Sequence, residues 1–329
     1  MRLLILAKIL KNLKTKLATF AFYNVENFYS NQTDFEYSFL PSNYSKWVET
    51  RYNFKVDKIS FAISRIGVKE TEDLPFLVGL CEVENEIVLN DLIKHENLID
   101  GNYNYVFYES LDERKINVAC IYRKDFIRID HSEPIRVVFK NQLDERSYTR
   151  DILFLEATIG EEKVYFFIVH LPSKLDLEVN QEKRGILLRK IQQRVALIKE
   201  KESDPKIIVM GDFNDTPTAE NIRLILNTKP SKQEVGINDF YNPMVGLMSY
   251  KRGSLVHHKQ WMLFDQMLFS HGFLTQNSTL EIVKTDIFDE SFLTVNVGKL
   301  RNFPARSFVG SKYLGGYSDH FPIYTIIKY

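Results

Sequence analysis

Polar side chains stand at the end of one apolar run after another in this sequence. Each carries a carboxylate, an amide or an imidazole, which are groups that bind metal ions, orient water or move protons. The residues are Asn24, Glu26, Glu82, His170, Asp212, Asn214, Asp319 and His320. Strand ends lead into loops, where binding and catalytic sites are assembled on a rigid base. A single carboxylate at such a place is often a cap or a turn former, but this many together predict a functional site.

The types of these side chains indicate a hard divalent cation. Carboxylate and amide oxygens suit Mg²⁺, with Mn²⁺ or Ca²⁺ as alternatives, whereas Zn²⁺ prefers histidine and cysteine. The seven histidines form no HExxH motif, and we interpret the adjacent pair His257 and His258 as a surface feature. Cys81 and Cys120 lie in apolar runs, so buried free thiols are expected rather than a disulfide.

The elements that position these residues are short apolar strands alternating with amphipathic helices. Strands are predicted at 17–24, 76–82, 117–123, 135–139, 152–159, 164–170, 207–212, 264–270 and 322–328. Helical spacing covers 53–66 and 178–203, where Leu187, Ile191, Val195 and Ile198 form one stripe. Asp215, followed by Thr and Pro, predicts the start of a helix that runs to Asn227. Sheets packed together with helices outside, an α/β sandwich, follow from this order.

Six motifs, taken in order, resemble the endonuclease/exonuclease/phosphatase superfamily. They are 22–27 (FYNVEN), 79–84 (GLCEVE), 170–173 (HLPS), 211–214 (GDFN), 261–268 (WMLFDQML) and 318–322 (SDHFP). The whole chain is most similar to a bacterial endonuclease-like subgroup, through 46–60 (KWVETRYNFKVDKIS) and 312–322 (KYLGGYSDHFP). Two positions depart from that subgroup: Asn117 stands where an acid is typical, with Lys115 in place of a glycine, and Leu171 replaces a tryptophan.

The resemblance implies a four-layer α/β sandwich, with two packed mixed β-sheets flanked by helices, and a Mg²⁺-dependent phosphoesterase. The residues that it assigns to the cation are Asn24, Glu26, Glu82 and Asp319. His320 is expected to accept a proton from the attacking water. Asp265 is expected to hydrogen-bond the other ring nitrogen and fix the tautomer, as in a hydrolase triad.

Further residues are expected to act on the phosphate. Asp212 would orient the water, Asn214 would donate to a phosphate oxygen, and His170 would contact the phosphate or assist the leaving group. Arg114 and Arg150 are candidates for substrate binding. For Arg150 an ion pair with an acid is an equal alternative.

The domain organisation is read as an N-terminal extension over 1–16 and one catalytic domain over 17–329. The opening decapeptide MRLLILAKIL is too short to span a bilayer. No other segment is long and apolar enough to do so. A cytoplasmic location is expected, with a degraded export signal as the alternative. No segment indicates an obligate protein partner.

Charge narrows the function classes. Lysine plus arginine and aspartate plus glutamate both number 43, so the net charge is zero, which argues against binding nucleic acid through a global positive field. A local basic groove stays open. The leading hypothesis is a metal-dependent phosphodiester hydrolase, an endonuclease-like nuclease acting on nucleic acid. The alternatives are a phosphomonoesterase or lipid or small-molecule phosphodiesterase at the same site, and, in another class, a catalytically silent phosphate-binding protein.

Overall fold

The computed structural model describes residues 16–32, 47–140, 145–174, 177–276, 278–309 and 312–329. Nearly all of the expected N-terminal extension therefore lies outside the described residues. Within the described part of the chain, no helix is long and apolar enough to cross a membrane.

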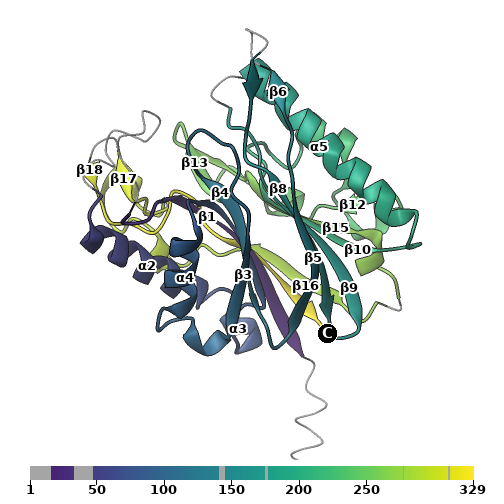
Figure 1. Cartoon of the computed structure of the whole chain (residues 1–329), viewed down its shortest axis with the longest axis horizontal. Helices are drawn as coiled ribbons and strands as arrows, with labels where there is room; N and C mark the ends of the chain where they lie inside the picture. The colour runs from purple at the N-terminus through teal and green to yellow at the C-terminus, as the bar shows by residue number, and fades with distance from the viewer. Residues whose placement is uncertain (1–15, 33–46, 141–144, 175–176, 277, 310–311) are drawn as a thin grey trace, which may run out of the picture.

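Two large mixed β-sheets form the centre of the molecule (Figure 1). The first sheet has the order β16 (Glu281–Ile287), β19 (Ile323–Lys328), β1 (Leu17–Phe28), β2 (Leu77–Val83), β4 (Asn117–Arg123) and β3 (Tyr103–Phe107). The second has the order β11 (Thr228–Lys229), β12 (Phe240–Tyr241), β15 (Asp265–Ser270), β10 (Lys206–Asp212), β9 (Glu162–His170), β8 (Ile152–Ile159) and β5 (Ile127–Ile135).

Short two-stranded ribbons extend from the loops. They are β13 (Leu255–His257) with β14 (Gln260–Met262), β17 (Phe308–Val309) with β18 (Lys312–Tyr313), and β6 (Phe139–Lys140) with β7 (Arg146–Ser147). The α-helices are α2 (Glu49–Ile63), α3 (Val68–Thr71), α4 (Glu86–Lys94), α5 (Leu177–Lys199), α6 (Glu220–Ile225) and α7 (Met244–Leu247). Single 3₁₀ turns occur at Ile99–Gly101, Lys232–Glu234, His271–Phe273, Ser291–Leu293 and Gly298–Leu300.

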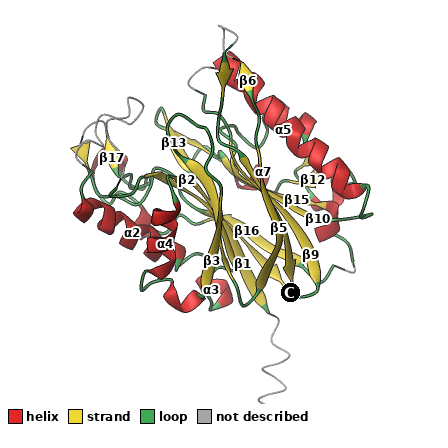
Figure 2. Cartoon of the chain, in the orientation of Figure 1, coloured by secondary structure: helices red, strands yellow, loops and turns green. Residues whose placement is uncertain are grey.

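The layers follow from where the apolar side chains point. α2, α3 and α4 cover the outer face of the first sheet, and α5 lies along the outer face of the second (Figure 2). Between the sheets the rings of Phe20 and Phe166 meet edge to face at 5.8 Å. The predicted stripe of α5 is buried in a second core against the outer face of β9 and β10. The expected four-layer α/β sandwich is confirmed.

Both sheets direct their functional strand ends to one edge of the sandwich. β1 runs parallel to β2, and β9 runs parallel to β10, so the carboxyl ends of these four strands share that edge. β15 and β19 run antiparallel to β10 and β1, and they therefore begin at this edge. Residues that are far apart in sequence are brought together at the open end of the two sheets.

Most of the buried strands were predicted, and the errors have physical causes. The strand expected at 135–139 is wrong, because Ile135 ends β5 and Phe139 begins β6. β3, β5 and β16 were missed, since they carry polar residues on an exposed face and lack a continuous apolar run. The helix expected from Asp215 begins only at Glu220, because Asp215 caps its own turn by accepting from Thr216 N at 2.9 Å.

Gly211 is required by the close approach of β9 and β10. Its φ is +154°, and a Cβ at this position would lie 2.1 Å from the carbonyl oxygen of Val169. Gly211→Ala is expected to lower the free energy of unfolding by about 2 kcal/mol or more, because backbone on the neighbouring strand cannot yield cheaply. Urea unfolding followed by circular dichroism measures this loss.

Gly246 is the matched control. It lies in α7, with no positive φ and no atom within 4 Å of an added Cβ. Gly246→Ala is expected to leave stability unchanged or raise it by up to about 1 kcal/mol. Equal effects of the two substitutions would contradict the steric argument.

Candidate active site

Strand register brings three of the expected side chains together on the second sheet. Asp212 is the last residue of β10, and it pairs with His170 at the end of the parallel strand β9. On its other side Asp212 pairs with Asp265 at the start of the antiparallel strand β15. All three side chains are at least 96% buried. Their association is therefore fixed by backbone hydrogen bonds of the sheet.

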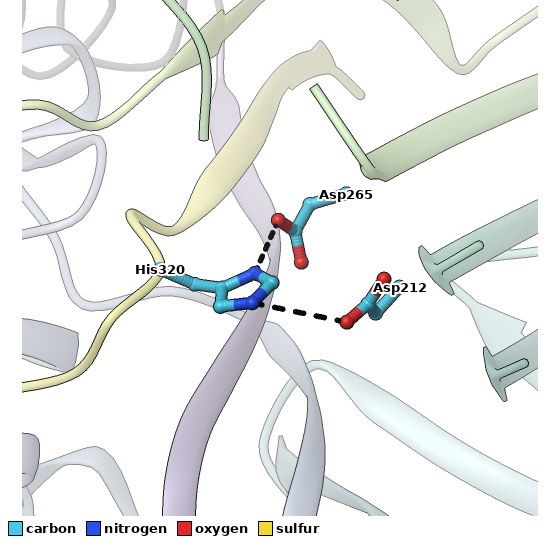
Figure 3. Close-up of side chains that lie close together, drawn as sticks. All are labelled: Asp212, Asp265 and His320. Carbon is cyan, nitrogen blue, oxygen red and sulfur yellow. Dashed lines mark hydrogen bonds and ion pairs between the residues drawn. The ribbon is translucent and has the colours of Figure 1, made fainter. Parts of the chain in front are cut away.

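His320 reaches this group from the first sheet. It precedes β19, and its Nδ1 lies 2.7 Å from Oδ2 of Asp265, while its Nε2 lies 3.9 Å from Oδ2 of Asp212 (Figure 3). Burial lowers the pKa of His320, but the Asp265 charge and hydrogen bond, together with Asp212, raise this pKa well above its ordinary value. The hydrogen bond between Asp265 and His320 is the one expected from the sequence, and it leaves Nε2 facing Asp212.

Asp212 faces three nitrogen atoms with one carboxylate oxygen. Its Oδ2 accepts from Asn24 Nδ2 at 3.2 Å and lies 3.7 Å from Nε2 of His170, besides the 3.9 Å to His320. Burial and then the neighbouring Asp265 raise the pKa of Asp212 to about 7. The two imidazole distances exceed a direct hydrogen bond and leave this oxygen suited to contact a water or a phosphate oxygen.

His170 is a neutral imidazole in this environment. Its complete burial, followed by the nearby cations Arg150 and Arg114, lowers its pKa well below the ordinary value. Nε2 lies 3.9 Å from Oε1 of Glu82, and Nδ1 is buried with no hydrogen-bond partner among the described residues. A neutral ring can donate to an anionic oxygen without adding a full charge to the site.

Glu82 and its neighbours lie on irregular backbone. Glu82, Glu26 and Asn27 all have positive φ, and both β1 and β2 change register at these residues. Such conformations cost of order 1–3 kcal/mol each for residues other than glycine, and they cluster at functional sites. Here they turn the Glu82 carboxylate so that Oε2 accepts from Asn27 N at 2.7 Å and Oε1 faces His170.

Glu26 and Asp319 lie in a neighbouring acidic cluster with two cations. Arg306 donates to Asp319 Oδ2 at 2.7 Å, and its Nε lies 3.7 Å from Glu26 Oε1. Lys55 of α2 donates to Ser307 Oγ at 2.8 Å and to the carbonyl oxygen of Tyr317 at 2.6 Å. Burial and then Asp319 raise the pKa of Glu26 to about 7. Burial lowers the pKa of Lys55 to about 8, against the opposing charges of Glu26, Asp319 and Glu82.

The donor set fits a hard cation. Glu26 and Asp319 share Arg306 as a partner, at 3.7 and 2.7 Å, and Glu82 Oε1 lies 3.9 Å from His170 Nε2. Every donor is a carboxylate or amide oxygen, as Mg²⁺ requires. Within the described chain the one group with ligand atoms inside 4.8 Å is Asp212, Asp265 and His320. We interpret that group as a proton-transfer site, because Nδ1 of His320 is already hydrogen-bonded to Asp265.

Asn214 and Arg114, which were also expected to act on the substrate, both keep groups near the strand-end edge. Asn214 is held by positive φ and donates from Nδ2 to the carbonyl oxygen of Leu171 at 2.8 Å, which leaves its second amide hydrogen for a ligand. Arg114 is 39% exposed, and it bonds Asn27 Oδ1 at 2.7 Å beside Glu82. Both lie at the rim of the strand-end edge.

Arg150 requires a correction. It is only 8% exposed, pairs with Asp112 at 3.3 Å and donates to the carbonyl oxygen of Leu171 at 3.0 Å. The pairing with an acid, which was the alternative interpretation, is the one observed. A buried and paired guanidinium supports the loop after His170 and is not an open phosphate clamp.

Sequence reasoning did not single out Lys55 or Arg306. Lys55 lies in the segment 46–60 that carried the resemblance, but its charge interrupts an apolar helical stripe and carries no motif by itself. Arg306 lies in a loop without periodicity. Their roles arise only when α2 and this loop meet the end of β1.

A family model described as the endonuclease/exonuclease/phosphatase family matches residues 19–329. The chain belongs to the endonuclease/exonuclease/phosphatase family. Members of this family hydrolyse phosphoester bonds and generally depend on divalent metal ions. No curated protein matches the sequence.

Solved structures share the fold at low identity. TDP2 from D. rerio, complexed with a single-strand DNA product, has 16% identity and a TM-score of 0.54, with 95% of this chain and 99% of that chain covered. A family protein from Bacteroides thetaiotaomicron has 13% identity and a TM-score of 0.56, with 95% of each chain covered. The mannosyl-6-phosphatase of that species has 13% identity and a TM-score of 0.53, with coverage of 95% and 100%.

The acidic donor set predicts divalent-cation binding that depends on Glu82. Glu82→Gln removes one negative charge and one ligand oxygen without changing the size of the side chain. Isothermal titration with Mg²⁺ or Mn²⁺ is expected to show at least a 10-fold weaker affinity than the unaltered protein, in line with the cost of removing groups at a metal site.

Glu86→Gln is the control, since Glu86 is exposed in the first turn of α4 and outside the site. It is expected to bind the ion as the unaltered protein does. Equal affinity of the Glu82 and Glu86 variants would remove Glu82 from the cation site.

Proposed function

We propose that the chain is a metal-dependent phosphodiester hydrolase whose attacking water is activated by the His320–Asp265 pair. The observation that carries this proposal is the buried hydrogen bond between these two side chains, with Nε2 directed to Asp212. A structural imidazole would need no open nitrogen facing a second carboxylate. This arrangement argues against a silent phosphate-binding protein.

The chain's own residues divide the work. His320 takes the proton of the water at Nε2, and Asp265 holds the ring in place and stabilises the imidazolium that forms. Asp212 orients the water, and Asn214 and His170 donate hydrogen bonds to phosphoryl oxygens. Asn24, Glu26, Glu82 and Asp319 would hold the divalent cation, which would supply charge neutralisation for the phosphate ester.

A nucleic-acid substrate is the finer proposal. The hairpin β13–β14 carries His257, His258 and Lys259 at its exposed tip. Burial lowers the pKa of His257, and the neighbouring His258 and then Lys174 lower it further. Lys174 lies in the loop after His170, so the hairpin is close to that loop. Lys259, Lys174 and Arg114 are the cations that would form a basic rim beside the site despite the zero net charge. The DNA product bound to the similarly folded TDP2 supports the same substrate class by analogy.

A phosphomonoesterase is the second candidate. Arg150 and Arg184 are buried and donate to carbonyl oxygens of the loop 171–172, and Lys174 pairs with Asp215. Fewer cations are thus available for a phosphate chain. The similarly folded mannosyl-6-phosphatase shows that this fold also carries a monoesterase.

The proton-transfer role predicts the effect of Asp265→Asn. The amide has the shape of the carboxylate but cannot stabilise the imidazolium, and it favours the wrong tautomer. With Mg²⁺ and bis(p-nitrophenyl) phosphate, kcat is expected to fall about 10²- to 10⁴-fold at nearly constant KM. An unchanged circular dichroism spectrum checks that the fold persists. Wild-type kcat in this variant would refute the proposed base.

The substrate class is tested by nicking of supercoiled plasmid. With Mg²⁺ the unaltered protein is expected to nick the DNA, and Asp212→Asn is expected to be inactive. Binding should weaken with salt at a logarithmic slope near −0.9 for each phosphate contacted by the rim. The measurement compares nicking and binding at two salt concentrations.

Two outcomes separate the candidates. Absence of nicking together with rapid phosphate release from p-nitrophenyl phosphate would favour the phosphomonoesterase. Nicking that persists in Asp212→Asn would indicate a contaminating nuclease.

A further inference from the structure

Arg252 is held by an unusual number of acceptors for a residue of a connecting loop. It lies in the loop between α7 and β13, and its guanidinium donates four hydrogen bonds. Nε and Nη2 bond the two oxygens of Asp289 at 2.7 and 2.9 Å, Nη1 bonds Asp286 at 2.8 Å, and Nη2 bonds the carbonyl oxygen of Ile287 at 2.9 Å. Its side chain joins the loop to the end of β16.

The residues directly after Arg252 contact the backbone of both members of the proton-transfer pair. Ser254 accepts from the backbone N of Phe321 at 2.6 Å with its carbonyl oxygen, and its Oγ lies 3.4 Å from the backbone N of Asp265. Leu255 forms a β-bridge with His320 itself. The segment 252–255 is therefore inserted between the start of β15 and the start of β19.

The opposite side of the His320 segment is bonded to the same end of β16. Phe288 N donates to the carbonyl oxygen of Pro322 at 2.8 Å, and Ile287 pairs with Ile323. The backbone from His320 to Ile323 thus lies between the 252–255 segment and the end of β16. Arg252 links these two flanking segments and closes a ring of hydrogen bonds through Phe321 and Pro322, the two residues directly after His320.

We propose that Arg252 is a positioning residue that clamps the backbone carrying His320 at hydrogen-bond distance from Asp265. This inference rests on the proposed catalytic role of that pair. The planar guanidinium is suited to the task, because its fixed fork of donors satisfies two carboxylates and a carbonyl at once, which an ammonium cannot do. Gly253 allows the close fit, since a Cβ there would lie 2.2 Å from the carbonyl oxygen of Met262.

The clamp acts on geometry and leaves the substrate untouched. Arg252→Gln is expected to lower kcat by about 10- to 10²-fold at unchanged KM, the loss that a displacement near 1 Å produces in a catalytic group. Arg252→Lys retains the charge but not the fork, so it is expected to lose nearly as much. Full activity of the lysine variant would show that only the positive charge matters, and it would contradict the proposed clamp.

Arg128→Gln is the matched control. Arg128 lies on β5, remote from the site, and it pairs with Asp130 at 2.6 Å and with Thr158 at 3.1 Å. It is expected to retain wild-type kcat. If Arg252→Gln behaves as Arg128→Gln does, Arg252 is an ordinary surface ion pair and the inference is wrong.

A double-mutant cycle with Asp265→Asn separates positioning from general loss of structure. If Arg252 acts through the pair, Arg252→Gln costs no further activity once Asp265 has been replaced. Multiplicative losses in the double variant would overturn the inference. Activity is measured with Mg²⁺ and bis(p-nitrophenyl) phosphate, as for the single variants.

A nuclear magnetic resonance readout keeps this test independent of the proposed function. In protein labelled with ¹⁵N-histidine, the Nδ1 proton of His320 is expected to be protected by its bond to Asp265 and to be absent from Asp265→Asn. Arg252→Gln is expected to speed its exchange with water, and Arg128→Gln is not. An unchanged exchange rate in Arg252→Gln overturns the clamp even if the protein hydrolyses neither ester.

Discussion

The hydrogen bond between Asp265 and His320 crosses from one sheet of the sandwich to the other. Asp265 begins β15 in the second sheet, and His320 precedes β19 in the first. A buried carboxylate and a buried imidazole are each costly unless they are paired, because neither is solvated by water. Their 2.7 Å separation is therefore sensitive to the spacing of the sheets, and the large aromatic core between the sheets sets that spacing.

Burial also divides the charges at the strand-end edge into two neighbouring groups. Around Asp212 lie two histidines and a second aspartate, and His320 is hydrogen-bonded to Asp265 at 2.7 Å. The negative charges of Glu26 and Asp319 are balanced by the cations Lys55 and Arg306. The raised pKa values of Asp212 and Glu26 share two causes, which are burial and then a second carboxylate nearby.

Some of the strained backbone lies at the same edge. Glu26, Asn27, Glu82 and Asn214 all have positive φ. Each of these residues supplies a carboxylate or amide to the site or its rim. Regular strands would direct alternate side chains to opposite faces, and the local turns instead aim consecutive polar groups at one place. The strained residues occupy only the last positions of β1 and β2 and the turn after β10. The regular hydrogen bonding along the rest of these strands offsets the cost of the strain.

Low sequence identity to the similar structures limits what they share with this chain to the fold. Asn117, the first residue of β4, departs from the subgroup, and this departure has a structural explanation. Asn117 accepts from Ser110 and donates to the carbonyl oxygen of Glu84, so the amide holds the loop together where an acid could not donate.

The sequence by itself determined the buried strands, the α/β sandwich and the residue types at the strand ends. Continuous apolar runs restrict the fold, because strands such as β10 and β9 must be covered on both faces. The edge strands β3, β5 and β16 escaped prediction, since half of their surface is solvated and their pattern resembles a loop. Only the tertiary structure decided which charged side chains pair with one another. Arg150 lies beside Asp112, and Arg306 lies between Glu26 and Asp319, because charge pairing depends on distances between segments that are far apart in the chain.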